Sequence, residues 1–140
     1  MKDNLFFDHI ILIDDDSIIN HVHELLVKRH IAAKNITSYL NPLNAIIAIQ
    51  NLLQQENLKI LVFLDLNMPE ITGFEFLDKV AELENNTKVF DIIIVSSSID
   101  SNDISRGENH PLVRTYIAKP ITSNKLKELK ENYLQLEVQY

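Results

Sequence analysis

The chain has 140 residues and a net charge of −7, with 13 basic and 20 acidic side chains and no cysteine. This length suits one compact domain, and contents of 46% hydrophobic and 24% charged residues exclude a disordered or fibrous chain. The acidic balance argues against binding to nucleic acid, and a chain without cysteine has neither disulfides nor thiolate metal sites.

The sequence shows no sign of targeting to a membrane. No apolar stretch reaches the roughly 18 to 20 residues of a membrane span, and the first seven residues lack the apolar core of a signal peptide. We therefore expect a cytoplasmic protein that forms a single domain over residues 1–140, with no separate effector domain.

The first half of the chain predicts alternating strands and helices. Residues 10–13 form a continuous apolar run, which is typical of a strand buried on both faces, and residues 17–29 have helical spacing. Residues 36–40 mix polar and apolar side chains, as an edge strand does, and a second helical pattern covers residues 42–53. We expect the first helix to bury Ile18, Val22, Leu25 and Leu26.

The second half continues the same alternation. Apolar runs at residues 60–64 and 92–95 predict two more buried strands, and residues 73–83 between them have helical spacing. Residues 113–118 predict the second edge strand, and a last helix begins at Ser123. This helix presents along one face Leu126, Leu129, Tyr133 and Leu136.

The connection between the last two strands is an exception. It contains Gly107 and Pro111 and few apolar positions. Because glycine and proline disfavour a helix interior, we expect only a short helix that starts near Asp103 and ends by Gly107.

The alternation of strands and helices predicts an α/β fold. Three buried strands belong at the centre of the sheet and two mixed strands at its edges. This placement fits the flavodoxin-like, doubly wound, five-stranded parallel sheet of order 2-1-3-4-5, with helices on both faces. In that order, the C-terminal ends of strands one and three flank the ligand crevice.

Acidic residues follow the two strands that this order makes neighbours. Asp14, Asp15 and Asp16 follow the first strand, and Asp65 follows the third. Carboxylates this close repel one another unless a cation is bound, and an oxygen-only ligand set favours Mg²⁺ or Mn²⁺ over zinc. We expect Asp16 or Ser17 to cap the next helix, which leaves the other aspartates for a metal.

Polar residues also follow the fourth and fifth strands. Ser96 places a hydroxyl where it could bond a phosphoryl oxygen, although serines at strand ends are also common in caps and turns. Lys119, followed by Pro120, would face the carboxylates, but taken alone it would be interpreted as a surface lysine. The loop after Asp65 can present the backbone carbonyl of Asn67 to a metal.

Together these features resemble the receiver domain of bacterial response regulators, of the single-domain, chemotaxis-regulator-like kind. The resemblance covers the whole chain and rests on the order of the motifs at the strand ends rather than on any one of them. The motifs are Asp14-Asp15, Leu64-Asp65-Leu66-Asn67-Met68-Pro69 with Gly73, Ser96, Tyr116 and Lys119-Pro120.

The resemblance implies a role for each residue of the acidic site. Asp65 is expected to be the phosphoacceptor. Asp14, Asp15 and the carbonyl of Asn67 are expected to hold Mg²⁺ or Mn²⁺ together with it. Lys119 is expected to bind the phosphoryl group.

The resemblance also implies a switch. Ser96 is expected to be the switch hydroxyl, in a position where threonine is common, and Tyr116 the switch aromatic. The family usually makes the bond between Lys119 and Pro120 cis. The fourth crossover, with Gly107, departs from the family pattern.

The implied function is signal transduction by a two-component system. The chain would accept a phosphoryl group from a sensor histidine kinase or a histidine phosphotransfer protein, and then signal to a protein target or relay the group. It would catalyse only its own phosphorylation and dephosphorylation. Two alternatives are a phosphohydrolase with an aspartyl nucleophile, which usually has a second acid where this chain has Asn67, and a degenerate receiver that binds its partner constitutively.

The five histidines are expected to lie mostly at the surface. His21 and His23 are two residues apart and therefore face different sides of a helix. This spacing excludes a simple two-histidine metal site.

Overall fold

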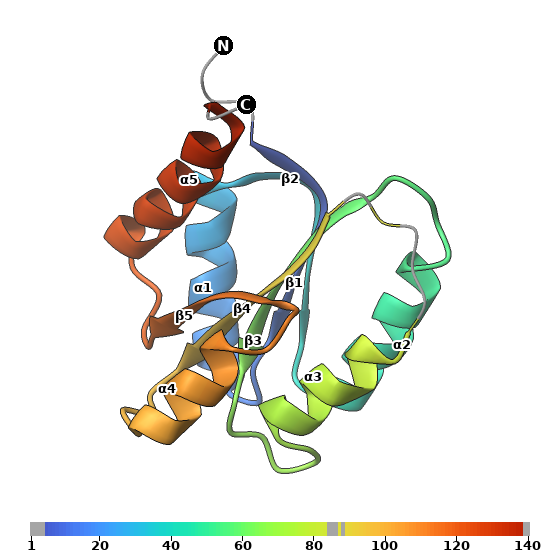
Figure 1. The fold of residues 1–140 in the computed structure, drawn as a ribbon, viewed down its shortest axis with the longest axis vertical. Helices are drawn as coiled ribbons and strands as arrows, with labels where there is room; N and C mark the ends of the chain where they lie inside the picture. The colour runs from blue at the N-terminus through green and yellow to red at the C-terminus, as the bar shows by residue number, and fades with distance from the viewer. Residues whose placement is uncertain (1–4, 84–86, 88, 139–140) are drawn as a thin grey trace.

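Strands and helices alternate along the chain, as the sequence predicts (Figure 1). The computed structural model describes residues 5–83, 87 and 89–138. No helix within these ranges is long and apolar enough to cross a membrane. The elements are β1 Phe6–Ile13, α1 Ser17–His30, β2 Ala32–Tyr39, α2 Pro42–Leu52, β3 Lys59–Asp65, α3 Gly73–Ala81, β4 Val89–Ser96, α4 Ser101–Glu108, β5 Val113–Ala118 and α5 Ser123–Val138.

The five strands form one parallel sheet of order β2-β1-β3-β4-β5, which confirms the predicted topology. In the register of β1 and β3, Ile13 lies opposite Leu64. The next residues along these strands, Asp14 and Asp65, are therefore neighbours at the C-terminal edge of the sheet.

Two apolar cores cover the two faces of the sheet. Helices α1 and α5 lie on one face, and α2 and α3 lie on the other (Figure 1). Residues 10–13 of β1 are buried, because helices cover both faces of this central strand. Helix α5 contributes Leu126, Leu129 and Tyr133 to the core on the face that α1 and α5 cover, as predicted. The side chain of Leu136 lies outside the described residues.

The predicted buried face of α1 is wrong. Ile18, Val22 and Leu25 are 74%, 46% and 55% exposed. The helix instead buries Asn20, His23 and Val27, with Leu26 partly buried against the core. Two polar residues on the inward face made the apolar pattern misleading, and both have hydrogen-bond partners near the C-terminal edge of the sheet.

Helix α4 is short, with eight residues, as predicted, but its predicted limits are wrong. The helix begins at Ser101, where the side chain of Asp100 caps it, and it continues through Gly107 to Glu108. A Cβ atom at Gly107 would lie 2.7 Å from Cδ1 of Ile94 on β4. This glycine therefore does not end the helix but allows it to pack closely on the sheet.

Helix α3 also packs closely on its surroundings at Gly73, its first residue, where the neighbouring atoms include the backbone. A Cβ atom there would lie 2.7 Å from Cα of Leu66 and 2.9 Å from the carbonyl oxygen of Asp65. The Gly73 N–H also donates to the carbonyl of Leu66 at 2.8 Å. The glycine thus fixes the loop that follows the end of β3.

Gly73→Ala is expected to lower the free energy of unfolding by about 1 to 3 kcal/mol, because the added methyl group overlaps backbone atoms that cannot move independently. Gly107→Ala is the matched control. Its methyl group meets the movable end of Ile94, and alanine gains about 1 kcal/mol of helix propensity. Urea denaturation of both variants checks this difference, and equal losses would contradict it.

Candidate functional site

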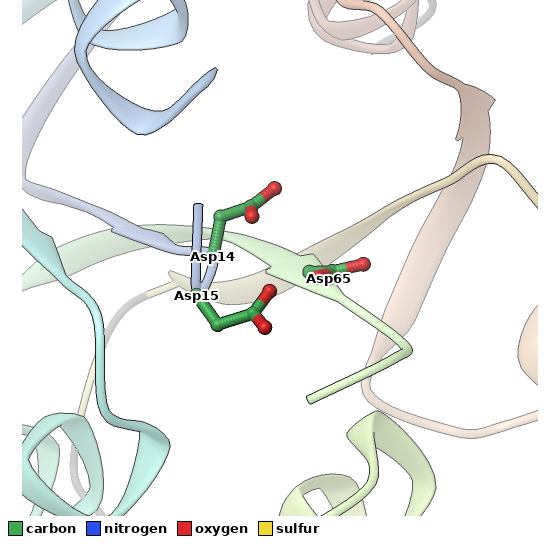
Figure 2. A group of neighbouring side chains, drawn as sticks. All are labelled: Asp14, Asp15 and Asp65. Carbon is green, nitrogen blue, oxygen red and sulfur yellow. The ribbon is translucent and has the colours of Figure 1, made fainter. Parts of the chain in front are cut away.

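Three carboxylates gather at the C-terminal edge of the sheet (Figure 2). Asp14 and Asp15 follow β1, and Asp65 ends β3; one oxygen from each lies within 4.8 Å of the other two. Asp14 and Asp65 are each only 4% exposed, whereas Asp15 is exposed. The arrangement is the acidic cluster that the sequence predicts at this place.

Asp16 has a different role from its two neighbours. Its side chain accepts hydrogen bonds from the N–H groups of Ile18 and Ile19 and caps α1, as expected. Its own N–H donates to Oδ1 of Asp14 at 2.9 Å. Helix capping therefore uses Asp16 and leaves the remaining aspartates for other chemistry.

Lys119 places an ammonium group against two of the carboxylates. Its Nζ lies 2.7 Å from Oδ2 of Asp14 and 3.4 Å from Oδ1 of Asp65. The backbone N–H of Lys119 donates to the carbonyl of Ser96 at 2.9 Å, and this bond joins the end of β5 to the end of β4. The bond from Lys119 to Pro120 is cis, as predicted.

Burial and charge perturb both partners of this ion pair. Burial raises the pKa of Asp65, and the charge of Asp14 raises it further, against the opposing effects of Lys119 and the Asn67 N–H. Burial by itself lowers the pKa of Lys119, but the hydrogen bond that its ammonium donates to Asp14 and the charges of both carboxylates outweigh this effect and raise that pKa. The site therefore favours the charged form of Lys119, and it disfavours ionisation of Asp65 beside Asp14.

The loop after β3 contacts the carboxylate of Asp65. The N–H of Asn67 donates to Oδ1 of Asp65 at 3.3 Å, and the side chain of Asn67 is exposed. The role of the Asn67 carbonyl as a metal ligand stays a prediction.

The expected switch residues, Ser96 and Tyr116, lie on adjacent strands and share a neighbour. Ser96 is fully buried at the end of β4, and its Oγ accepts a hydrogen bond from the N–H of Ser98 at 3.1 Å. Tyr116 on β5 donates its hydroxyl to the carbonyl of Ser98 at 3.2 Å. Both side chains are therefore bonded to the main chain of the segment between β4 and α4.

Two residues of α1 that the motifs did not include support the site. Asn20 donates its side-chain amide to the carbonyls of Asp14 at 3.4 Å and Tyr39 at 3.1 Å. His23 is buried, an exception to the expectation that histidines lie mostly at the surface, and its Nε2 accepts from the N–H of Ile121 at 3.2 Å. The signal in the sequence is a pair of polar residues, spaced by three, beside an apolar helical stripe.

The donor set fits a hard divalent cation. The three clustered ligand groups are carboxylates from Asp14, Asp15 and Asp65, and no histidine of the described residues belongs to this group. Oxygen ligands suit Mg²⁺ or Mn²⁺, which would also neutralise the repulsion between the acids.

Comparisons with known proteins identify the family of this chain. The family model for the response regulator receiver domain matches residues 10–131. The probable methanogenesis regulatory protein FilR2 of Methanothrix harundinacea is 27% identical over 135 residues, covering 89% of this chain and 83% of that protein.

Solved structures show the same fold. A two-component response regulator from Cytophaga hutchinsonii is 28% identical and superposes with a TM-score of 0.73, covering 92% of this chain and 97% of that one. A response regulator receiver protein from Dyadobacter fermentans has a TM-score of 0.74 at 23% identity, covering 89% and 96%. With its sheet order, its acidic cluster and the family match over most of its length, this chain belongs to the response regulator receiver domain family of two-component systems.

Proposed function

We propose that Asp65 is the phosphoacceptor of this receiver domain, and that Asp14, Asp15 and the Asn67 carbonyl hold Mg²⁺ or Mn²⁺ beside it. The observation that carries the proposal is the position of the Asp65 carboxylate. It lies within reach of two other acids for metal binding and 3.4 Å from the Lys119 ammonium. Receiver domains bind Mg²⁺ at such acidic residues, in agreement with this assignment.

The chemistry is transfer of a phosphoryl group from a phosphohistidine to a carboxylate oxygen of Asp65. A P–O bond to Asp65 forms as the P–N bond breaks, and the histidine nitrogen keeps the bonding electron pair. The bound cation supplies positive charge to the transferred oxygens. The Asn67 N–H orients the nucleophile, and the ammonium of Lys119 neutralises negative charge on the oxygens of the transferred phosphoryl group.

Signalling follows from a change of hydrogen-bond partners. The new phosphoryl oxygens compete for the hydroxyl of Ser96, which can donate to them while its oxygen gives up the bond from Ser98. Ser98 also binds Tyr116, so a shift of this segment alters the position of the Tyr116 ring. The altered surface is formed by α4, β5 and α5.

The partners are proteins of the same signalling pathway. Receiver domains interact with sensor histidine kinases or histidine phosphotransfer proteins, and we assign one of these as the phosphodonor. A downstream protein binds the altered surface or receives the phosphoryl group by relay. The only reactions that the domain catalyses are its own phosphorylation and dephosphorylation.

Acetyl phosphate tests the proposal without a cognate kinase. With Mg²⁺ present, the intact mass of the protein is expected to increase by one phosphoryl group, and EDTA should prevent the increase because the transferred charge is then poorly neutralised. An unchanged mass with Mg²⁺, or an equal gain with EDTA, would contradict the proposal.

A further inference from the structure

Two side chains hold the main chain on either side of Lys119. In the first turn of α5, Lys125 donates its ammonium to the carbonyls of Ala118 at 2.7 Å and Pro120 at 3.1 Å. From α1, His23 accepts the N–H of Ile121 at 3.2 Å. The backbone before and after Lys119 is thus bonded to two different helices.

His23 makes its contact as a neutral acceptor. A backbone N–H can only donate, so the Nε2 atom that meets Ile121 carries no proton and the ring proton is on Nδ1. His23 is only 3% exposed, and this burial lowers its pKa despite the opposing charge of Asp14. A buried polar group is costly unless it is hydrogen-bonded, so this contact accounts for a histidine on the inward face of α1.

The inward face of α1 contacts both the strand end that carries the acids and the loop that follows Lys119. Asn20 binds the carbonyl of Asp14 at the end of β1, and His23 binds Ile121 beyond the end of β5. Both residues also line a small cavity together with Asp14 and Asp65. Helix α1 therefore ties the loop that carries the lysine to the strand end that carries the acids.

We propose that His23 and Lys125 are positioning residues for the phosphorylation of Asp65, because they hold the main chain around Lys119 so that its ammonium meets the transferred phosphoryl group. The inference rests on the proposed function. Neither residue belongs to the acidic cluster. Both bond the main chain next to Lys119, and their effect on the reaction therefore passes through the position of that lysine. Outer-shell partners that orient metal ligands typically contribute about 10- to 100-fold, and we expect an effect at the lower end of that range for residues that orient Lys119.

The test measures the rate of phosphorylation by acetyl phosphate at saturating Mg²⁺, followed by intact mass. His23→Leu and Lys125→Met are each expected to slow the reaction about tenfold. His23→Gln should recover most of the rate, because its amide oxygen can accept the same N–H. Lys127→Met, at an exposed position on α5, is the matched control and should react like the wild type.

A double-mutant cycle separates positioning from general damage to the fold. If His23 acts through Lys119, His23→Leu has little further effect in a Lys119→Ala background, since the group it positions is already absent. Mg²⁺ affinity should not fall in His23→Leu, because the acidic ligands keep their places and a displaced Lys119 competes less for them. Equal slowing by His23→Leu in both backgrounds would overturn the inference.

Two further results are decisive. If His23→Leu does not fold, the phosphorylation rate of Lys125→Met provides the test, because Lys125 is partly exposed and its replacement should leave the fold intact. A wild-type rate for Lys125→Met would then overturn the inference. A wild-type protein that gains no phosphoryl group would instead refute the proposed function, so the two failures are distinguishable.

Discussion

Asp65→Asn is expected to abolish phosphorylation by acetyl phosphate, because an amide cannot provide the nucleophile that the carboxylate provides. Intact mass should show no phosphoryl group on this variant under conditions in which the wild type is modified. Glu56→Gln is the matched control, since it removes an exposed acid before β3, at the other end of the sheet. A full gain of mass by Asp65→Asn would place the acceptor elsewhere.

The same substitution should stabilise the metal-free protein at neutral pH. Burial and the charge of Asp14 raise the pKa of Asp65 in the folded state, so ionisation of this group costs folding free energy. The amide removes that cost while preserving the shape, and we expect a gain on the order of 1 kcal/mol in denaturant titrations.

The sign of this effect gives it a pH dependence. A raised folded-state pKa means that Asp65 imposes no penalty below its unfolded value of 3.8, and that stability is lost as the pH rises through the folded-state pKa. The advantage of Asp65→Asn should therefore vanish in acid and persist at neutral pH. Saturating Mg²⁺ should reduce or reverse it, because the metal stabilises the wild type by binding. An advantage that grows towards low pH would contradict this account.

Lys119→Ala is expected to slow phosphorylation of Asp65 by about 100- to 1000-fold, the usual effect of removing one preorganised group that stabilises developing charge. Rates should be compared at saturating Mg²⁺ by following intact mass over time. Lys79→Ala provides a matched control, because Lys79 lies in the last turn of α3, away from the strand ends that form the site. A rate within a few-fold of the wild type would exclude a role for Lys119 in the transfer.

The same variant should have opposite effects on metal binding and on stability. The ammonium and a divalent cation compete for Asp14 and Asp65, so its removal should tighten Mg²⁺ binding. Without metal, the two buried carboxylates lose their counter-ion, and the free energy of unfolding should fall by about 3 kcal/mol. Calorimetric titration with Mg²⁺ and urea denaturation in EDTA measure the two effects. Weaker metal binding would contradict the competition.

Local pattern was sufficient to predict most of the fold. The apolar runs at residues 10–13, 60–64 and 92–95 all lie within central strands of the sheet, because a strand covered by helices on both faces needs apolar side chains at successive positions. The motif residues at the strand ends were found in the same way. Once the strand order is known, the ends of neighbouring parallel strands meet at one edge.

Local pattern failed where polar or small residues serve distant neighbours. In α1, the exposed Ile18, Val22 and Leu25 matched an inward stripe better than Asn20 and His23, which are the residues actually buried. Gly107 suggested the end of a helix, although its small size serves the approach of α4 to β4. Helical periodicity and propensity describe a single segment and carry no information about what that segment packs against.

By itself, the sequence determined the order of the elements, the central strands and the carboxylates, hydroxyl and lysine at their ends. Tertiary structure alone decided which face of α1 turns inward and which side chains bond the main chain on either side of Lys119. The bond from Ile121 to His23 joins residues 98 positions apart, and that from Tyr116 to Ser98 joins β5 to the segment after β4. Such contacts depend on how whole helices pack on the sheet, and packing brings together side chains whose separation along the chain has no period to detect.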